Sequence, residues 1–158
     1  MEKIASFQIN HERLLPGLYV SRLDKSGEEF VTTFDIRITR PNFDDVMDTA
    51  SIHAIEHLGA TYLRSSAIKD KVLYFGPMGC RTGFYLLIFG NLTPSDILPY
   101  IKDTFLYILN FEGKIPGQSA IECGNYKDLS LEGAKCYAKK YLDEFLLNSP
   151  IDRMIYPN

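Results

Sequence analysis

The sequence predicts an α+β fold, in which an antiparallel β-sheet packs against helices. Runs of alternating or wholly apolar residues predict two pairs of strands, and apolar residues at helical spacing predict three helices. The order is strands, helix, strands, helix, helix, and the short connections between strands are typical of antiparallel pairing. The chain has 158 residues with no linker or repeat, so we expect one domain over residues 1–158.

The first two strands are expected to form a hairpin over residues 18–39, with its turn near residues 24–27. The second arm alternates regularly, and one of its faces carries Phe30, Thr32, Phe34, Ile36 and Ile38. The arm ends before Pro41, because proline has no backbone N–H to donate to a neighbouring strand.

A helix and two more strands follow the hairpin. The helix is expected over residues 48–65, capped by Asp48 or Thr49, with its apolar residues at helical spacing. Strands are expected over residues 71–75 and 82–89. The second of these strands is apolar on both faces, so it should lie inside the sheet.

Two helices complete the pattern. The first begins at Thr93 or Ser95, and its apolar stripe consists of Ile97, Ile101, Phe105 and Ile108. A loop rich in Gly and Pro then leads to Cys123. The last helix is expected over residues 130–147, with one side formed by Leu131, Ala134, Ala138, Leu142 and Phe145.

Composition argues against several classes of protein. A content of 46% hydrophobic and 13% aromatic residues excludes wholesale disorder. The net charge of −3 argues against a nucleic-acid partner, which would need a basic face. The longest wholly apolar run, residues 84–89, is far too short to span a membrane, and residues 1–10 carry no secretory signal. Three cysteines are a poor basis for disulfides, so we expect a soluble, cytoplasmic protein with reduced thiols.

The most specific motif is an H-x-x-E-H pattern on the first predicted helix. His53 and His57 stand four residues apart, so they lie on one helix face and can bind the same divalent metal. Glu56 lies on nearly the same face, where it can act as a general base without being a ligand. The alternative is coincidence, with two histidines flanking an amphipathic stripe, but the pattern is rare in a chain of this length.

Two histidines do not complete a metal site, so a third ligand is needed. His11 is far away in the sequence. Cys123 precedes Gly124 in a polar loop and can supply a thiolate, although a free cysteine is often just a small buried apolar residue. Glu122 beside it is the carboxylate alternative.

The other two cysteines differ in their surroundings. Cys80 lies in a glycine-rich segment between two predicted strands, where a ligand can approach the backbone closely. A nearby metal cation would favour a thiolate, which can move protons, whereas the alternative is a turn cysteine without a role. Cys136 lies off the apolar stripe of the last helix, and we expect it to be neutral.

Together these motifs resemble the S-ribosylhomocysteine lyases, the LuxS family. The resemblance runs from Ser6 to about Lys135, and five separated motifs occur in the family's order. They are Ser6-Phe7 with His11, Phe34-Asp35-Ile36-Arg37 with Pro41-Asn42, Ile52-His53 with Glu56-His57-Leu58, Pro77-Met78-Gly79-Cys80-Arg81-Thr82-Gly83, and Cys123-Gly124 with Leu131-Glu132-Gly133-Ala134-Lys135.

The resemblance implies the α+β fold of that family and a homodimer with two sites at the subunit interface. It implies one Fe(II) per subunit, with Zn(II) or Co(II) as substitutes, held by His53, His57 and Cys123. Glu56 and Cys80 would then be the proton-transfer residues. Ser6, His11 and Arg37 would help to hold the substrate, some of them from the partner subunit.

The implied reaction splits the thioether of S-ribosyl-L-homocysteine into L-homocysteine and 4,5-dihydroxy-2,3-pentanedione, the autoinducer-2 precursor. The carbonyl of the open sugar must move from C1 to C3, which places the sulfur β to it and makes elimination easy. Each move takes a proton from a carbon beside the carbonyl, which calls for a general base and a metal that acts as a Lewis acid. The resemblance thereby connects the chain to homocysteine metabolism and to quorum sensing.

Four positions depart from the family's usual pattern. They are Asn10, Thr39-Arg40, Tyr74-Phe75 and Leu129. None of these departures removes an implied metal ligand or proton carrier, so they bear on substrate contacts rather than on the reaction.

Two other interpretations use the same motif. An inverted-motif metallopeptidase also carries H-x-x-E-H, but it needs a carboxylate as third ligand, for which Glu132 is the candidate, and it has no use for Cys80. A non-catalytic binding domain would use the two histidines only for structure, and it would hold no metal tightly.

Overall fold

The structure of the protein is a computed structural model that describes residues 7–158. The predicted substrate-binding residue Ser6 lies outside the described residues. No helix of the described part is long and apolar enough to cross a membrane.

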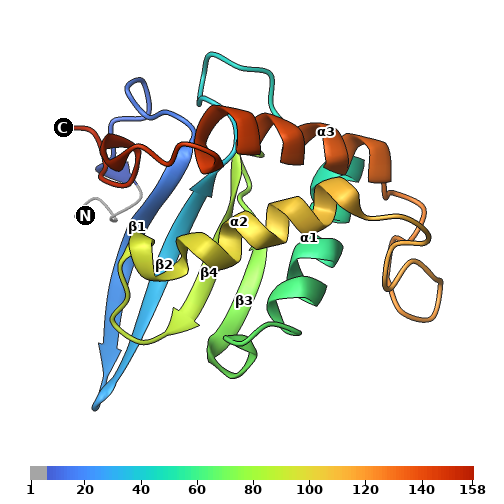
Figure 1. Cartoon of the computed structure of the whole chain (residues 1–158), viewed down its shortest axis with the longest axis horizontal. Coiled ribbons are helices and arrows are strands. Elements are labelled where there is room, and N and C mark those ends of the chain that lie inside the picture. Colours follow the sequence, from blue (N-terminus) through green and yellow to red (C-terminus); the bar gives the residue numbers. More distant parts are fainter. Residues whose placement is uncertain (1–6) are drawn as a thin grey trace.

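Within residues 7–158, four strands form an antiparallel sheet in the order β1–β2–β4–β3 (Figure 1). The strands are β1 (Gly17–Ser26), β2 (Glu29–Arg37), β3 (Val72–Pro77) and β4 (Gly83–Phe89). β4 lies between β2 and β3, which confirms that the strand with two apolar faces is internal. With three helices packed beside this sheet, the α+β class is confirmed.

The hairpin turn lies later in the chain than the sequence suggested. Ser26 pairs with Glu29, so the turn consists of Gly27 and Glu28 rather than residues 24–27. Gly27 has a φ of 60°, a conformation that glycine adopts without strain, and this lets β1 continue as far as Ser26.

Helix α1 (Thr49–Leu63) begins after Asp48, one of the two predicted caps. The Asp48 carboxylate accepts hydrogen bonds from the backbone N–H of Ser51 (2.9 Å) and from its hydroxyl (2.6 Å). These hydrogen bonds lower the pKa of Asp48. The ring of Phe75 on β3 lies against Gly59 of α1, and any side chain at Gly59 would displace it. The cap at Asp48 fixes where α1 begins, and the packing of Phe75 against Gly59 holds the helix beside the edge of the sheet.

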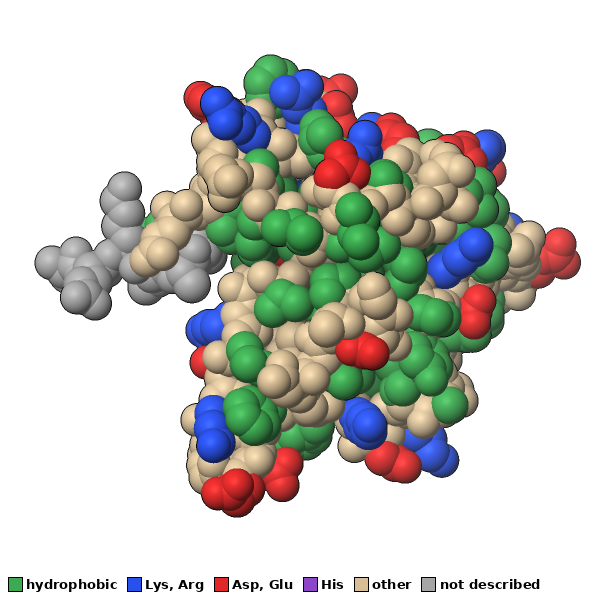
Figure 2. Space-filling view, turned by 60° about the vertical axis from the view of Figure 1, so that its left-hand side comes forward, with side chains coloured by type: hydrophobic (Ala, Val, Ile, Leu, Met, Phe, Trp, Pro, Cys, Tyr) green, Lys and Arg blue, Asp and Glu red, His purple; other side chains and the backbone are tan. Residues whose placement is uncertain are grey.

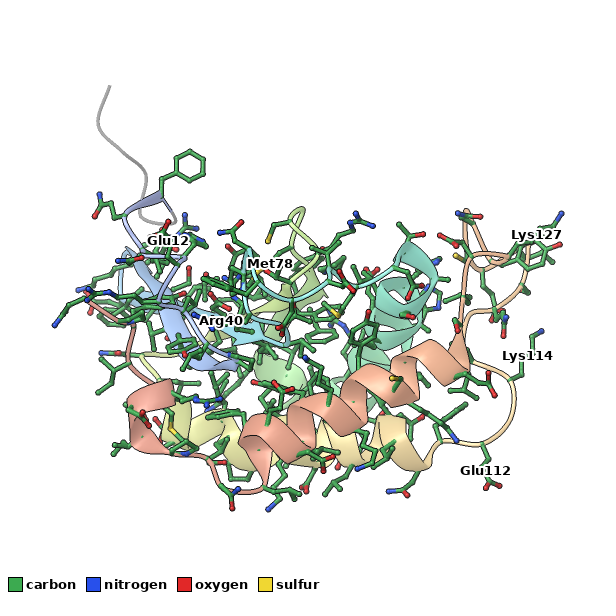
Figure 3. The ribbon with its side chains drawn as sticks, turned by 90° about the horizontal axis from the view of Figure 1, so that it is seen from above. Glu12, Arg40, Met78, Glu112, Lys114 and Lys127 are labelled. Carbon is green, nitrogen blue, oxygen red and sulfur yellow. The ribbon has the colours of Figure 1, made fainter. Side chains whose placement is uncertain are left out.

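Helix α2 (Pro94–Asn110) begins after Thr93, whose backbone N–H and hydroxyl both donate to Asp96 (2.7 Å each). Its predicted stripe is buried, with Ile97, Ile101, Phe105 and Ile108 in the core. Figure 3 shows α2 side by side with α3 (Leu131–Tyr141), both on one side of the sheet. The core therefore lies between the sheet and this pair of helices.

The last predicted helix is two pieces in the structure. α3 ends at Tyr141, and Leu142–Leu146 forms a wider π-helical turn. The wider turn keeps Leu142, Phe145 and Leu146 buried together, whereas Leu131 at the other end is only half-buried. The Tyr141 hydroxyl donates to the carbonyl of Gly17 (2.7 Å) and ties this helix to β1. The chain then turns at Ile151–Arg153, and its C-terminus lies on the same side of the molecule as β1 (Figure 1).

Candidate active site

Helix α1 brings His53 and His57 together, as their spacing predicted. The centres of their rings are 4.6 Å apart, and the ring planes are nearly perpendicular. Both side chains are half-buried. Because α1 is capped at Asp48 and packed along its length, the two imidazoles are carried by a rigid element.

The loop between α2 and α3 orients both rings. Nδ1 of His53 lies 2.8 Å from the carbonyl oxygen of Asp128, and Nδ1 of His57 lies 2.8 Å from that of Pro116. A carbonyl only accepts hydrogen bonds, so each Nδ1 carries the proton and each Nε2 keeps a free lone pair. This arrangement is typical of histidines that bind a metal through Nε2.

The same loop brings Cys123 to the histidines. Its Sγ lies 3.4 Å from Nε2 of His53, and ligand atoms of His53, His57 and Cys123 lie within 4.8 Å of one another. Nitrogen and sulfur ligands of one tetrahedral ion lie roughly 3.6 Å apart, so this spacing suits a shared metal. Gly117 has a φ of 76°, and a Cβ there would lie only 2.9 Å from Nδ1 of His57, so the loop can approach this closely only with glycine.

Cys123 and its neighbour Glu122 make different hydrogen bonds within the loop. The Cys123 N–H donates to the carbonyl of Ser119 (3.0 Å), and the N–H of Asn125 donates to the Cys123 sulfur (3.4 Å). Glu122 is exposed and accepts from the Ser119 hydroxyl (2.5 Å). The group that can hold a metal therefore contains Cys123, and it includes neither Glu122 nor the exposed Glu132 on α3.

The residues present fit a transition-metal ion. Two imidazole nitrogens and one thiolate are the donors that Zn(II), Fe(II) and Co(II) accept, and three protein ligands leave a coordination position open for water or substrate. Glu56 is half-buried on the same helix, and its carboxylate makes no hydrogen bond or ion pair with another residue of the described chain. It is thus available to take a proton from a bound molecule.

Cys80 belongs to a second cluster, at the adjacent ends of β2 and β4. Its Sγ lies 3.9 Å from Nη1 of Arg37 and 3.1 Å from the hydroxyl oxygen of Thr82. Nη1 of Arg37 also donates to that hydroxyl oxygen (2.6 Å), which leaves the Thr82 proton free to point toward the sulfur. A guanidinium and a hydroxyl group therefore both lie within contact distance of the Cys80 sulfur.

Arg37 is almost fully buried, and its charge is balanced by Asp35. The Asp35 carboxylate accepts from Nε (3.1 Å) and Nη2 (2.5 Å) of Arg37, which is a bidentate pair. Burial acts to lower the pKa of Arg37, but the charge of Asp35 and its hydrogen bond raise it. The guanidinium therefore stays cationic beside Cys80.

A cavity of about 290 Å³ opens onto this second cluster. The cavity contains three predicted site residues, since it is lined by His11, Arg37, Pro41, Asn42, Asp44, Val46, Cys80 and Thr82. His11 is fixed by an interaction between its Nδ1 and the carbonyl of Ile9 (2.9 Å). Arg81, next to Cys80, has a φ of 59°, an uncommon conformation for a residue other than glycine. The cavity lining includes none of the three candidate metal ligands, so the two clusters are separate within one chain.

The sequence of the chain matches a known protein family over most of its length. Residues 4–151 match the protein family described as S-ribosylhomocysteinase (LuxS). The chain belongs to the LuxS family.

Relatives that match the chain over its full length share the name S-ribosylhomocysteine lyase. The S-ribosylhomocysteine lyase of Clostridium beijerinckii is 55% identical over 159 residues, with all of both chains covered. That of Finegoldia magna is 56% identical over 157 residues, with 99% of each chain covered. The one from Borreliella burgdorferi is 48% identical over 158 residues, covering 99% of this chain and 100% of the relative. The family resemblance inferred from five motifs is thereby confirmed.

LuxS membership also decides between the interpretations of the H-x-x-E-H motif. The peptidase alternative required a carboxylate such as Glu132, but the metal-capable group contains Cys123 instead. Neither the family match nor the relatives' names support a peptidase. Three contacts escaped sequence reasoning, namely the histidine partners Asp128 and Pro116 and the hydroxyl of Thr82. The two backbone carbonyls leave no signal in a sequence, whereas Thr82 stands two residues after Cys80 within the predicted motif.

Proposed function

We propose that this LuxS-family protein is a metal-dependent lyase that cleaves S-ribosyl-L-homocysteine into L-homocysteine and 4,5-dihydroxy-2,3-pentanedione. The observation that carries the proposal is the group of His53, His57 and Cys123 beside Glu56, in a chain that is 55% identical to a named lyase over its whole length. We take residues 1–158 as one catalytic domain.

The metal is Fe(II), one per subunit, with Zn(II) or Co(II) as substitutes, and its ligands are His53, His57 and Cys123. The two histidine nitrogens and the sulfur suit each of these ions. When bound, the metal acts as a Lewis acid that stabilises negative charge on the sugar oxygens as protons leave the adjacent carbons. No redox change is needed for carbonyl migration or for elimination.

Glu56 and Cys80 carry the protons. The carbon–sulfur bond breaks readily only when the carbonyl stands at C3, so a proton must be moved between neighbouring carbons twice before the β-elimination. Glu56 is supported as one carrier by its free carboxylate on α1, next in sequence to His57. Cys80 is supported as the other by its position in a cavity with Arg37 and Thr82, both of which contact its sulfur.

Substrate is held by Ser6, His11 and Arg37. His11 and Arg37 line the cavity that also contains Cys80, so both lie where a ligand of Cys80 would be bound. Arg37 is anchored on Asp35, which fixes the direction in which its remaining N–H groups point.

The protein works as a homodimer with its sites at the interface, and some substrate-binding residues come from the partner subunit. Two observations support an interface. The metal ligands and the Cys80 cavity are separate within one chain. Large hydrophobic side chains are also exposed, including Phe7 (71%), Phe43 (59%), Tyr74 (48%) and Val46, and Val46 lines the Cys80 cavity itself. Figure 2 shows hydrophobic side chains gathered over the middle of one face, as is typical of surfaces that bury against a partner.

We propose that the enzyme works in the cytoplasm and consumes the S-ribosylhomocysteine that a preceding reaction forms. Its two products would connect it to homocysteine metabolism and to the synthesis of the autoinducer-2 precursor. No nucleic-acid or membrane partner is proposed.

The test measures both products from S-ribosylhomocysteine in one sample. Homocysteine is followed as new free thiol, and the dicarbonyl product is trapped with an aromatic 1,2-diamine. The proposal predicts equal amounts of the two products. Formation of neither product by metal-loaded protein would overturn it.

A further inference from the structure

The C-terminal segment reaches the Cys80 cluster through Tyr156. The Tyr156 hydroxyl donates to Oδ2 of Asp35 (2.8 Å), 121 residues away in sequence. The ring of Tyr156 stacks on that of Tyr19 of β1, with centres 4.8 Å apart and planes within 9° of parallel. Tyr156 lies beyond residue 151, where the family match ends.

A continuous set of contacts leads from this phenol to the sulfur. Oδ2 of Asp35, which accepts from Tyr156, also accepts from Nη2 of Arg37. Nη1 of Arg37 in turn contacts both the Thr82 hydroxyl and the Cys80 sulfur. Asp35 and Arg37 are 1% and 2% exposed, so water cannot replace a lost partner.

We propose that Tyr156 is a positioning residue for Cys80, acting through Asp35 to hold the guanidinium of Arg37 beside the Cys80 sulfur. The role of Cys80 itself rests on the proposed function, but the positioning does not. Burial and the charge of Asp35 raise the pKa of Tyr156, so the phenol keeps the proton that it donates. Without that hydrogen bond, Oδ2 of Asp35 would be held by Arg37 alone. The guanidinium would then follow the freed carboxylate and lie less firmly against the sulfur.

The test compares two alkylating reagents that react with the same thiol. Iodoacetate is anionic and iodoacetamide is neutral, so a guanidinium beside the sulfur speeds iodoacetate relative to iodoacetamide. Mass spectrometry of the metal-loaded protein gives this rate ratio separately for the peptides that contain Cys80 and Cys136. The exposed Cys136 is an internal reference, because it stands on α3 and makes no hydrogen bond with Arg37 or Asp35.

Tyr156→Phe removes the hydroxyl and keeps the ring that stacks on Tyr19. We expect it to lower the Cys80 ratio about threefold, the size of a partly exposed charge interaction, and to leave the Cys136 ratio unchanged. Tyr156→Ala, which also removes the ring, should lower the Cys80 ratio at least as far.

Tyr141→Phe is the matched control, because it removes a buried tyrosine hydrogen bond to a backbone carbonyl instead of to Asp35. We expect the control to lower thermal stability without changing the Cys80 ratio. An unchanged Cys80 ratio in folded Tyr156→Phe protein would overturn the inference, and so would an equal fall in Tyr141→Phe. Alkylation needs no substrate, so the two proposals can fail separately. If wild-type protein released no homocysteine but Tyr156→Phe still lowered the Cys80 ratio, the positioning role would be upheld and the lyase proposal rejected.

Discussion

Nε2 of His53 lies 3.4 Å from Sγ of Cys123, although 70 residues separate them in the chain. The histidine is fixed on α1, and the cysteine is fixed on a loop that also supplies carbonyls to both imidazoles. The loop thus contributes one candidate ligand and orients the other two. Metal binding should therefore depend on this loop as strongly as on the histidines.

Cys123→Ser should weaken metal binding by more than about a hundredfold, because a neutral hydroxyl is a poor replacement for a thiolate. Metal content after dialysis and competition with a coloured chelator measure the loss. Glu122→Gln is the matched control, since Glu122 precedes Cys123 but bonds to Ser119. A full metal complement in Cys123→Ser protein would mean that another residue is the third ligand.

Glu56→Gln should bind metal and substrate normally and turn over about 10² to 10⁴ times more slowly, because the amide cannot accept a proton. Steady-state kinetics and metal analysis of the same sample check this. Glu132→Gln, an exposed glutamate on α3, should keep the wild-type rate. A normal rate in Glu56→Gln protein would assign the base to another group.

Cys80→Ala should keep its metal and its oligomeric state and lose lyase activity, because no other described cysteine lines the cavity. Cys136→Ala, at an exposed helix position, controls for the loss of a thiol and should stay active. Substantial turnover by Cys80→Ala would remove Cys80 from the mechanism.

Asp48 should make stability depend on pH at the acid end. Hydrogen bonds from Ser51 lower the pKa of Asp48 in the folded protein. A depressed folded pKa contributes stability that is present above the usual aspartate value of about 4 and is lost as pH falls below it. Denaturant unfolding of Asp48→Asn should show a smaller decrease in stability than wild type between about pH 4 and pH 2. Equal decreases in both proteins would show that Asp48 does not contribute to the pH dependence of stability.

Removing the metal should destabilise the fold, because the ion binds only where α1 and the α2–α3 loop are assembled. Free metal at a hundred times its dissociation constant would add about 2.7 kcal/mol to the free energy of unfolding. Thermal melts with and without a chelator measure the effect. The chelator should have no effect on Cys123→Ser protein, and an equal shift in both proteins would place the stabilising ion elsewhere.

Local patterns predicted most of the secondary structure and placed three residues of the candidate site on one helix. His53, Glu56 and His57 follow from helical spacing alone, and the internal position of β4 follows from its two apolar faces. The hairpin turn was misplaced because β1 continues polar and exposed to Ser26, where no apolar pattern marks its end.

The remaining site features depend on contacts between distant segments. The sequence alone did not decide whether Cys123 or Glu122 is the third metal ligand. The choice depends on the hydrogen bonds that both residues make with Ser119 in the folded loop. The proximity of Arg37 and Cys80 requires the pairing of Arg37 with Gly83 across β2 and β4, which neither strand pattern specifies. Tyr156 gave no signal at all, since it stands in a short irregular tail.

The most direct test of the account is an iron titration of metal-free protein under anaerobic conditions, with homocysteine release measured at each step. Activity should rise in proportion to added Fe(II), reach a plateau at about one ion per chain, and be absent in Cys123→Ser protein. Homocysteine release by metal-free protein, or a plateau that Cys123→Ser also reaches with the same stoichiometry, would contradict the account.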